Sequence, residues 1–197
     1  MTDILYITAS IRGDESISRK LGNKLVEGLA KKHDATVTVR DLAANDLPFV
    51  SAERFAANLT PKDERTPEQA ELAEISDTLI AELQAADIIV LATPVYNFGV
   101  PATVKAWADL VARQGTTFKY TESGPVGLLD AKKAYVTAAS GGTAMGSNID
   151  YMSTWLTFFL GFLGISDVEL VAADGIMGED AEEKIAKAHE AVDALAV

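Results

Sequence analysis

Five short apolar runs recur along the chain, and they constrain its fold more than any other feature. Each has the length and the β-branched content of a strand buried on both faces, rather than the alternation of a half-exposed strand. The runs are Ile4–Ala9, Thr36–Val39, Ile88–Ala92, Ala134–Ala138 and Val168–Ala172. Between and after them lie segments of helical periodicity, at Ser18–Lys32, Pro67–Ala85, Ala102–Val111, Ile149–Phe162 and Asp180–Ala196.

This alternation predicts an α/β protein with a doubly wound, five-stranded parallel sheet and helices on both faces. Parallel neighbours need a crossover connection, which is nearly always right-handed, and five such strands favour the order 2-1-3-4-5. The 197 residues contain no repeat or linker, so a single domain covering residues 1–197 is expected. Ligands bind such sheets beyond the carboxyl ends of the strands, where the order reverses. The loops after strands 1, 3 and 4 are therefore the candidate site.

Two connections are longer than a simple crossover requires, Asp41 to Arg65 and Gln114 to Asp130. Long ordered connections often carry function. The first connection and the Phe-rich helix Ile149–Phe162 together offer apolar surface that a single copy of the chain would have difficulty burying. We therefore expect a homodimer.

The composition argues against several classes of function. A formal charge of −12 opposes binding to nucleic acid or to an anionic membrane surface, and the apolar stretch Trp155–Ile165 is shorter than the roughly 20 residues that span a bilayer. Without a cysteine there is no thiolate for a disulfide, a metal site or a nucleophile, so redox chemistry would need a bound cofactor. Thr2 and Asp3 do not resemble the start of a signal peptide. A cytoplasmic location is expected.

The loop after the first strand leads directly into a helix and is suited to a phosphate. It places the hydroxyls of Ser10, Ser16 and Ser18, with the amides near Ile17, at a helix N-terminus, where free N–H groups and the helix dipole favour an anion. The same serines could instead only cap the helix. Neither the Gly-x-Gly-x-x-Gly pattern nor a Lys-containing P-loop is present, which favours a mononucleotide.

The loop after the third strand is suited to a flat ring. Its prolines stiffen a segment that presents two aromatic side chains beside backbone N–H groups, as a flavin ring requires. The alternative is that both rings are core residues beneath a turn. The residues concerned are Pro94, Val95, Tyr96, Asn97, Phe98 and Gly99.

The loop after the fourth strand is rich in glycine, which allows a ligand to approach the backbone closely. It contains Ser140, Gly141, Gly142 and Thr143. Paired glycines carry little information alone. Together, however, the three loops come from neighbouring strands and would line one crevice, with phosphate donors at one end and a ring slot at the other. This convergence favours FMN.

Longer motifs extend over nearly the whole chain and carry a family resemblance. They are Ser10 with Ser16–Ser18, Val39–Ala44, Pro94–Phe98, Asp109–Arg113, Gly115–Glu122, Gly124–Leu128 and Phe159–Ile165. On these motifs the chain resembles the FMN-dependent NADH azoreductases, which are related to the NAD(P)H quinone oxidoreductases. It departs from the family pattern at Ala139-Ser140-Gly141-Gly142, where Ser-Arg-Gly-Gly is frequent. The preference for NADH or NADPH is therefore left open.

The resemblance implies a flavodoxin-like fold and an enzyme with tightly bound FMN. Such an enzyme takes NADH or NADPH as electron donor and reduces small aromatic acceptors, quinones and azo compounds, by ping-pong two-electron hydride transfer through the flavin. The serines would bind the FMN phosphate and the other two loops the ring, with no catalytic side chain and no metal ion. The substrate wall would consist of Phe98, Tyr120 and Phe162 in a homodimer, and which subunit supplies each aromatic residue is left open.

Three alternatives stay open on the residues alone. Phe162 lies in an apolar run, where an aromatic is more often a core residue than a substrate contact. The chain could be a flavodoxin-like one-electron carrier that serves a protein partner. It could also be a flavin-free binding or regulatory protein on the same fold.

Overall fold

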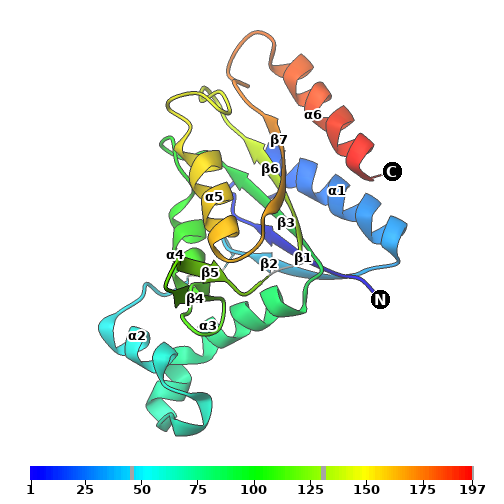
Figure 1. Ribbon diagram of the computed structural model, residues 1–197. Helices are drawn as coiled ribbons and strands as arrows, with labels where there is room; N and C mark the ends of the chain where they lie inside the picture. The colour runs from blue at the N-terminus through cyan, green and yellow to red at the C-terminus, as the bar shows by residue number, and fades with distance from the viewer. Residues whose placement is uncertain (45–46, 130–131, 197) are drawn as a thin grey trace.

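A computed structural model describes residues 1–44, 47–129 and 132–196, and its centre is one parallel sheet (Figure 1). The strands are β1 (Asp3–Thr8), β2 (Thr36–Asp41), β3 (Ile88–Pro94), β6 (Lys133–Ala139) and β7 (Asp167–Ala173). Their order is β2-β1-β3-β6-β7, and every neighbouring pair is parallel. These are the five strands expected from the sequence, within two residues at each end, in the order 2-1-3-4-5.

Helices cover both faces of the sheet, as right-handed crossovers require. On one face lie α1 (Ile17–His33) and α6 (Ala181–Ala196), and on the other α3 (Pro67–Ala85), α4 (Ala102–Val111) and α5 (Tyr151–Phe162) (Figure 1). Each lies within two residues of its expected range. Two apolar cores result, one on each face of the sheet. The doubly wound arrangement is therefore present.

The two long connections contain elements that the sequence analysis did not predict. The first carries the eight-residue helix α2 (Ala52–Leu59) and a 3-10 turn, η2 (Lys62–Glu64); the second carries an antiparallel hairpin of β4 (Phe118–Thr121) and β5 (Gly124–Gly127). Positions 45–46 and 130, which belong to these connections, lie outside the described residues. A further 3-10 turn, η1 (Gly13–Glu15), precedes α1.

Helix α1 packs against the sheet through a glycine that leaves no room for a side chain. A Cβ atom on Gly22 would lie 2.7 Å from Tyr6 Oη and 2.9 Å from Ala92 Cβ. The Tyr6 hydroxyl donates to Asn23 Oδ1 at 2.7 Å, and burial raises its pKa, so it stays protonated and keeps this bond. The N-terminus of α1 is thereby held at the carboxyl edge of β1 and β3.

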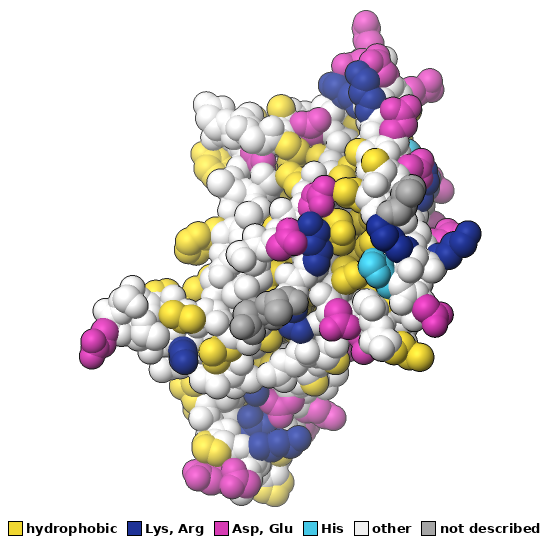
Figure 2. Space-filling model, turned by 45° about the vertical axis from the view of Figure 1, so that its right-hand side comes forward, with side chains coloured by type: hydrophobic (Ala, Val, Ile, Leu, Met, Phe, Trp, Pro, Cys, Tyr) yellow, Lys and Arg dark blue, Asp and Glu magenta, His cyan; other side chains and the backbone are white. Residues whose placement is uncertain are grey.

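The surface carries charge of both signs and exposed apolar side chains. On the face seen in Figure 2, Lys and Arg side chains are interspersed with acidic ones rather than gathered in one patch. Within the described ranges, no helix has the length and apolar character needed to cross a membrane.

A buried ion network joins the first long connection to the helices beneath it. Asp77 of α3 accepts from Arg65 Nη1 at 2.6 Å and also from Arg113, which follows α4. Arg113 further donates to Asn58 Oδ1 of α2 at 3.2 Å. Burial alone would raise the pKa of Asp77, but the hydrogen bonds from both arginines outweigh it and lower that pKa.

We predict that Asp77→Asn lowers the free energy of unfolding by roughly 3 kcal/mol at neutral pH, because two buried guanidinium groups lose their counterion. Since the folded pKa of Asp77 lies below its unfolded value, its stabilisation is complete above the unfolded pKa of about 4 and is lost as the pH falls through the folded pKa. Urea unfolding should therefore show that the difference in free energy of unfolding between the unaltered protein and Asp77→Asn becomes smaller as the pH falls from about 7 to about 3.

The matched control is Asp63→Asn, which removes a carboxylate from the exposed turn η2. It should change the free energy of unfolding by less than about 0.5 kcal/mol at every pH. If the loss of stability in Asp77→Asn did not depend on pH, the ionised Asp77 carboxylate would not be the source of the stabilisation.

Candidate functional site

A cavity of about 270 Å³ opens at the carboxyl ends of β1, β3 and β6. It lies beside the point at which the strand order reverses, between β1 and β3, where an open α/β sheet binds its ligands. Eight of the residues expected from the sequence line it: Ser10, Ser16, Ile17, Pro94, Val95, Tyr96, Ser140 and Gly141. The three loops therefore meet at one site, as expected.

The first loop supplies hydrogen-bond donors. Ser16 is the N-cap of α1, and its hydroxyl accepts from Arg19 N at 3.3 Å, so the expectation that it caps the helix is confirmed. Capping does not remove it from the cavity, which it lines together with Ile17. The first amides of a helix, here those of Ile17 and Ser18, have no acceptor within the helix itself. They remain available to an anion.

Ser18 is placed differently from the other two serines. Its side chain is fully buried and lies behind Ser16, with the two Oγ atoms 3.1 Å apart. Thr137 of β6 donates to its carbonyl oxygen at 3.1 Å. Ser18 does not line the cavity, so within this site it orients Ser16 rather than presenting its own hydroxyl.

The second loop is a tight turn with strained backbone. Tyr96 and Gly99 exchange two backbone hydrogen bonds of 3.0 and 3.1 Å, and the residues between them have positive φ, 49° at Asn97 and 69° at Phe98. These are the signs of a type I′ turn, whose second position usually holds glycine. A phenylalanine there is costly, and such strain is typical of functional sites.

Contacts on both sides hold this turn. The Tyr96 hydroxyl accepts from Ile11 N of the first loop at 3.3 Å, and the Phe98 carbonyl accepts from Tyr151 N at the start of α5 at 3.1 Å. The Phe98 side chain is 53% exposed, so it is not a core residue beneath the turn. Asn97, Phe98 and Gly99 adjoin the cavity along the chain but do not line it.

The third loop is paired with a fourth. Ile176 N donates to Ser140 O at 3.1 Å and Met177 N to Gly141 O at 3.0 Å, which joins the loop after β6 to the loop after β7. A Cβ atom on Gly141 would lie 2.8 Å from Met177 Sδ, so a larger residue there would have to displace the exposed Met177 side chain. Gly142 is exposed and Thr143 is buried, with its N–H donating to Ser140 Oγ at 2.9 Å; neither lines the cavity.

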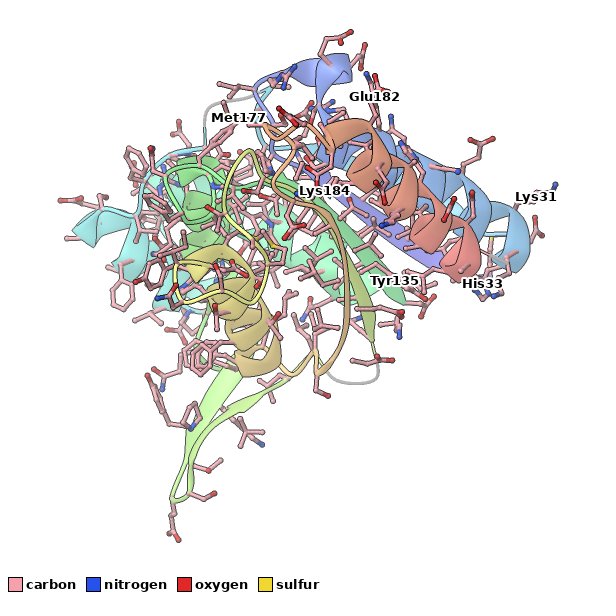
Figure 3. The ribbon with its side chains drawn as sticks, turned by 90° about the horizontal axis from the view of Figure 1, so that it is seen from above. Lys31, His33, Tyr135, Met177, Glu182 and Lys184 are labelled. Carbon is pink, nitrogen blue, oxygen red and sulfur yellow. The ribbon has the colours of Figure 1, made fainter. Side chains whose placement is uncertain are left out.

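Four lining residues were missed by the sequence analysis: Arg12, Ala139, Ile176 and Met177. Figure 3 shows Met177 on the loop that leads from β7 to α6, toward the N-terminal end of α1 and away from Lys31 and His33. Strand β7 ends at the same edge of the sheet as β6, so the loop after β7 also lies where such sheets bind their ligands. Arg12 lay within a loop already recognised.

Tyr120 and Phe162 do not reach the cavity of their own chain. The Phe162 ring, at the C-terminal end of α5, lies 4.5 Å from that of Phe118, and the Tyr120 ring lies 5.5 Å from that of Phe118 on the hairpin. Phe162 is therefore packed among aromatic side chains, whereas Tyr120 is 65% exposed.

The residues present fit a flavin mononucleotide. Two hydroxyls and the free amides of a 17-residue helix form a donor set for a phosphate, at one end of the cavity. Pro94, Val95 and Ile176 provide apolar surface for a ring, and the backbone at Gly141 can be approached closely. The fold and the site together define a nucleotide-binding protein with a doubly wound sheet.

Comparison with known proteins identifies the family. Residues 2–196 match the family model described as flavodoxin-like fold. The FMN-dependent NADH:quinone oxidoreductase of Erythrobacter litoralis is 68% identical over the full length of both chains. Two solved structures from Bacillus anthracis, an azoreductase and an FMN-dependent NADH-azoreductase in complex with FMN, are each 28% identical. Their TM-scores are 0.90 and 0.88, and the superpositions cover 100% of this chain and 99% and 98% of theirs. The chain belongs to the family of FMN-dependent NADH:quinone oxidoreductases.

We predict that Phe98→Gly is more stable than Phe98→Ala by about 1 kcal/mol, measured by urea unfolding at equal protein concentration. Both variants lose the ring, but only alanine keeps a Cβ atom in the left-handed region. At an ordinary helical position the alanine variant is the more stable of the two. At Phe55, a half-exposed phenylalanine in α2, Ala should be more stable than Gly by about 1 kcal/mol. Equal stability of the two Phe98 variants would contradict strain in the turn.

Proposed function

We propose that this protein is an FMN-dependent NADH:quinone oxidoreductase that also reduces azo compounds. The observation that carries the proposal is the cavity in which a serine-rich helix N-terminus, a proline-stiffened loop and a glycine loop converge. The names of the full-length relative at 68% identity and of the FMN-bound azoreductase structure support it. Both names also disfavour the one-electron carrier and the flavin-free protein.

The site residues divide between the two ends of the cofactor. Ser10, Ser16 and the amides of Ile17 and Ser18 would hold the phosphate. The ring would lie against two loops, formed by Pro94, Val95, Tyr96, Asn97, Phe98 and Gly99 and by Ser140, Gly141, Gly142 and Thr143. Bound FMN would supply the two-electron chemistry, taking a hydride from NADH or NADPH and passing it to the acceptor. The side chains position and shield the ring, and none needs to act as a nucleophile.

We further propose that the working form is a homodimer. An apolar groove of about 670 Å³ lies between the Gly99–Val100 end of the second loop and α5, lined also by Lys105, Tyr151, Thr154, Trp155 and Phe158. Phe158 is 74% exposed and Tyr151 63%, an unusual exposure for neighbouring aromatic side chains. The first long connection adds exposed Phe49, Phe55 and Leu59. A second copy would cover this surface and bring Tyr120 and Phe162 to the neighbouring cavity. We place the enzyme in the cytoplasm, where NADH is available.

Steady-state kinetics with NADH and NADPH, against a quinone and an azo dye, test the proposed reaction. We predict parallel double-reciprocal lines, because donor and acceptor would occupy the same space in turn, and two equivalents of NADH consumed for each azo bond. Intersecting lines would contradict the ping-pong order. A stable one-electron state on photoreduction, with no NADH-dependent turnover, would instead indicate an electron carrier.

Light scattering at micromolar protein tests the dimer. We predict a mass of twice the chain mass of 20.9 kDa, and a single-chain mass for Phe158→Glu, which places a charge in the apolar groove. Val39→Glu is the matched control, because Val39 is also exposed but lies on the other face of the sheet from the groove. It pairs in register with Tyr6, whose side chain is on the α1 side. A single-chain mass for the unaltered protein would refute the proposal.

A further inference from the structure

Of the described residues that line the cavity, Arg12 alone carries a charged side chain. It lies at the turn between β1 and α1, beside Ser10 and Ser16. The remaining donors at this end of the cavity are hydroxyls and amides, which are neutral. Arg12 is therefore the one cation available to a ligand in this part of the structure.

The backbone of Arg12 is fixed, but its side chain is not committed to another group. Its carbonyl accepts from Glu15 N at 3.1 Å and its amide donates to Ser10 Oγ at 3.3 Å. Gly13 follows with a φ of 52°, which turns the chain into η1. Arg12 is exposed, and within the described residues no carboxylate lies within 4 Å of its guanidinium.

Arg19, in the first turn of α1, shows the contrasting arrangement. Its Nη2 atom lies 2.7 Å from Asp41 Oδ2, and its side chain is only 16% exposed. Arg19 therefore has a carboxylate partner within the fold and joins α1 to the end of β2. The two arginines of this region differ in that only Arg12 has its charge free for a ligand.

The electrostatic surroundings favour a cation at this point. Asp14 and Glu15 follow in the same turn, and Glu15 has only a distant partner, Lys20 at 3.8 Å. A terminal phosphate carries about −1.5 to −2 charges at pH 7. It would be brought next to these carboxylates, in a chain whose formal charge is already −12. A cation offsets this repulsion more strongly than neutral hydroxyl and amide donors do.

We propose that Arg12 binds the terminal phosphate of FMN and is the residue that selects the phosphorylated flavin over riboflavin. The inference rests on the proposed function. A guanidinium can offer two N–H groups to phosphate oxygens at once, and Arg12 lines the cavity together with Ser10 and Ser16. The energy of this ion pair would make the affinity for FMN depend on ionic strength, whereas that for riboflavin would not.

Flavin titrations of the apoprotein test this, with quenching of flavin fluorescence as the readout. Arg12→Gln should weaken FMN binding on the order of ten- to hundredfold and leave riboflavin binding unchanged within about twofold. Raising the ionic strength from about 0.05 M to about 0.5 M should bring the FMN affinities of Arg12→Gln and the unaltered protein closer together. Salt screens the ion pair between Arg12 and the phosphate, so the unaltered protein has less to lose. Arg12→Lys should recover part of the affinity, since it restores the charge without the planar fork.

Lys20→Gln is the matched control. It removes one positive charge from α1, the helix that follows Arg12, at an exposed position that does not line the cavity. An equal loss of FMN affinity in Lys20→Gln and Arg12→Gln would overturn the proposal in favour of a general charge effect. Equal weakening of FMN and riboflavin would overturn it in favour of a role in shaping the loop. An unaltered protein that binds neither flavin would refute the cofactor itself, and so the proposed function.

Discussion

The reversal of strand order between β1 and β3 is the constraint on which the rest of the molecule depends. The chain leaves β1 toward β2 on one side and reaches β3 on the other, and right-handed crossovers then place α1 and α3 on opposite faces. No helix can close the gap between the carboxyl ends of the two strands. The apolar cores on both faces stabilise the sheet without filling this gap, so a cavity is a consequence of topology before any side chain is chosen.

The close packing of α1 brings the N-terminus of that helix to the cavity. Gly22 lets the helix approach β1 and β3 so closely that its first turn lies at the sheet edge, and Ser16 both ends the loop and begins the helix. The capping bond to Arg19 N and the contact with buried Ser18 fix the orientation of the Ser16 hydroxyl. A residue whose role is local, to start a helix, thus also has its polar group directed at the cavity. The two explanations of these serines are therefore compatible.

Periodicity predicted the sheet and the five large helices well, because burial on both faces of a strand and along one stripe of a helix leaves a clear pattern. It did not predict α2 or the β4–β5 hairpin. Helix α2 has only eight residues, so its stability comes from packing on α3 and not from its own sequence. In β5, a proline and two glycines in four residues read as a turn, and pairing with Phe118–Thr121 overrides that preference.

The site could be predicted to the extent that each residue follows a strand. Met177 and Ile176 had no local pattern; only their pairing with Gly141 and Ser140 brings them to the cavity. Phe98 and Phe162 show more clearly what the sequence cannot predict, because an aromatic residue in an apolar segment is expected to be buried whether it contacts a ligand or not. The positive φ of Phe98 turns its ring outward, whereas Phe162 is packed against Phe118.

The polar and apolar parts of the site are organised on different principles. Within one chain, the end of the cavity proposed for the phosphate consists of groups with fixed geometry, namely a capped helix, buried serines and loop amides held by backbone hydrogen bonds. The aromatic side chains are dispersed over a turn, a hairpin and the far end of a helix. Under the proposed assembly, the cofactor is recognised by one subunit, while the acceptor meets a wall shared by two and with few polar anchors. Such a wall discriminates by shape and flatness more than by hydrogen bonding, which accords with relatives named for quinones and for azo compounds alike.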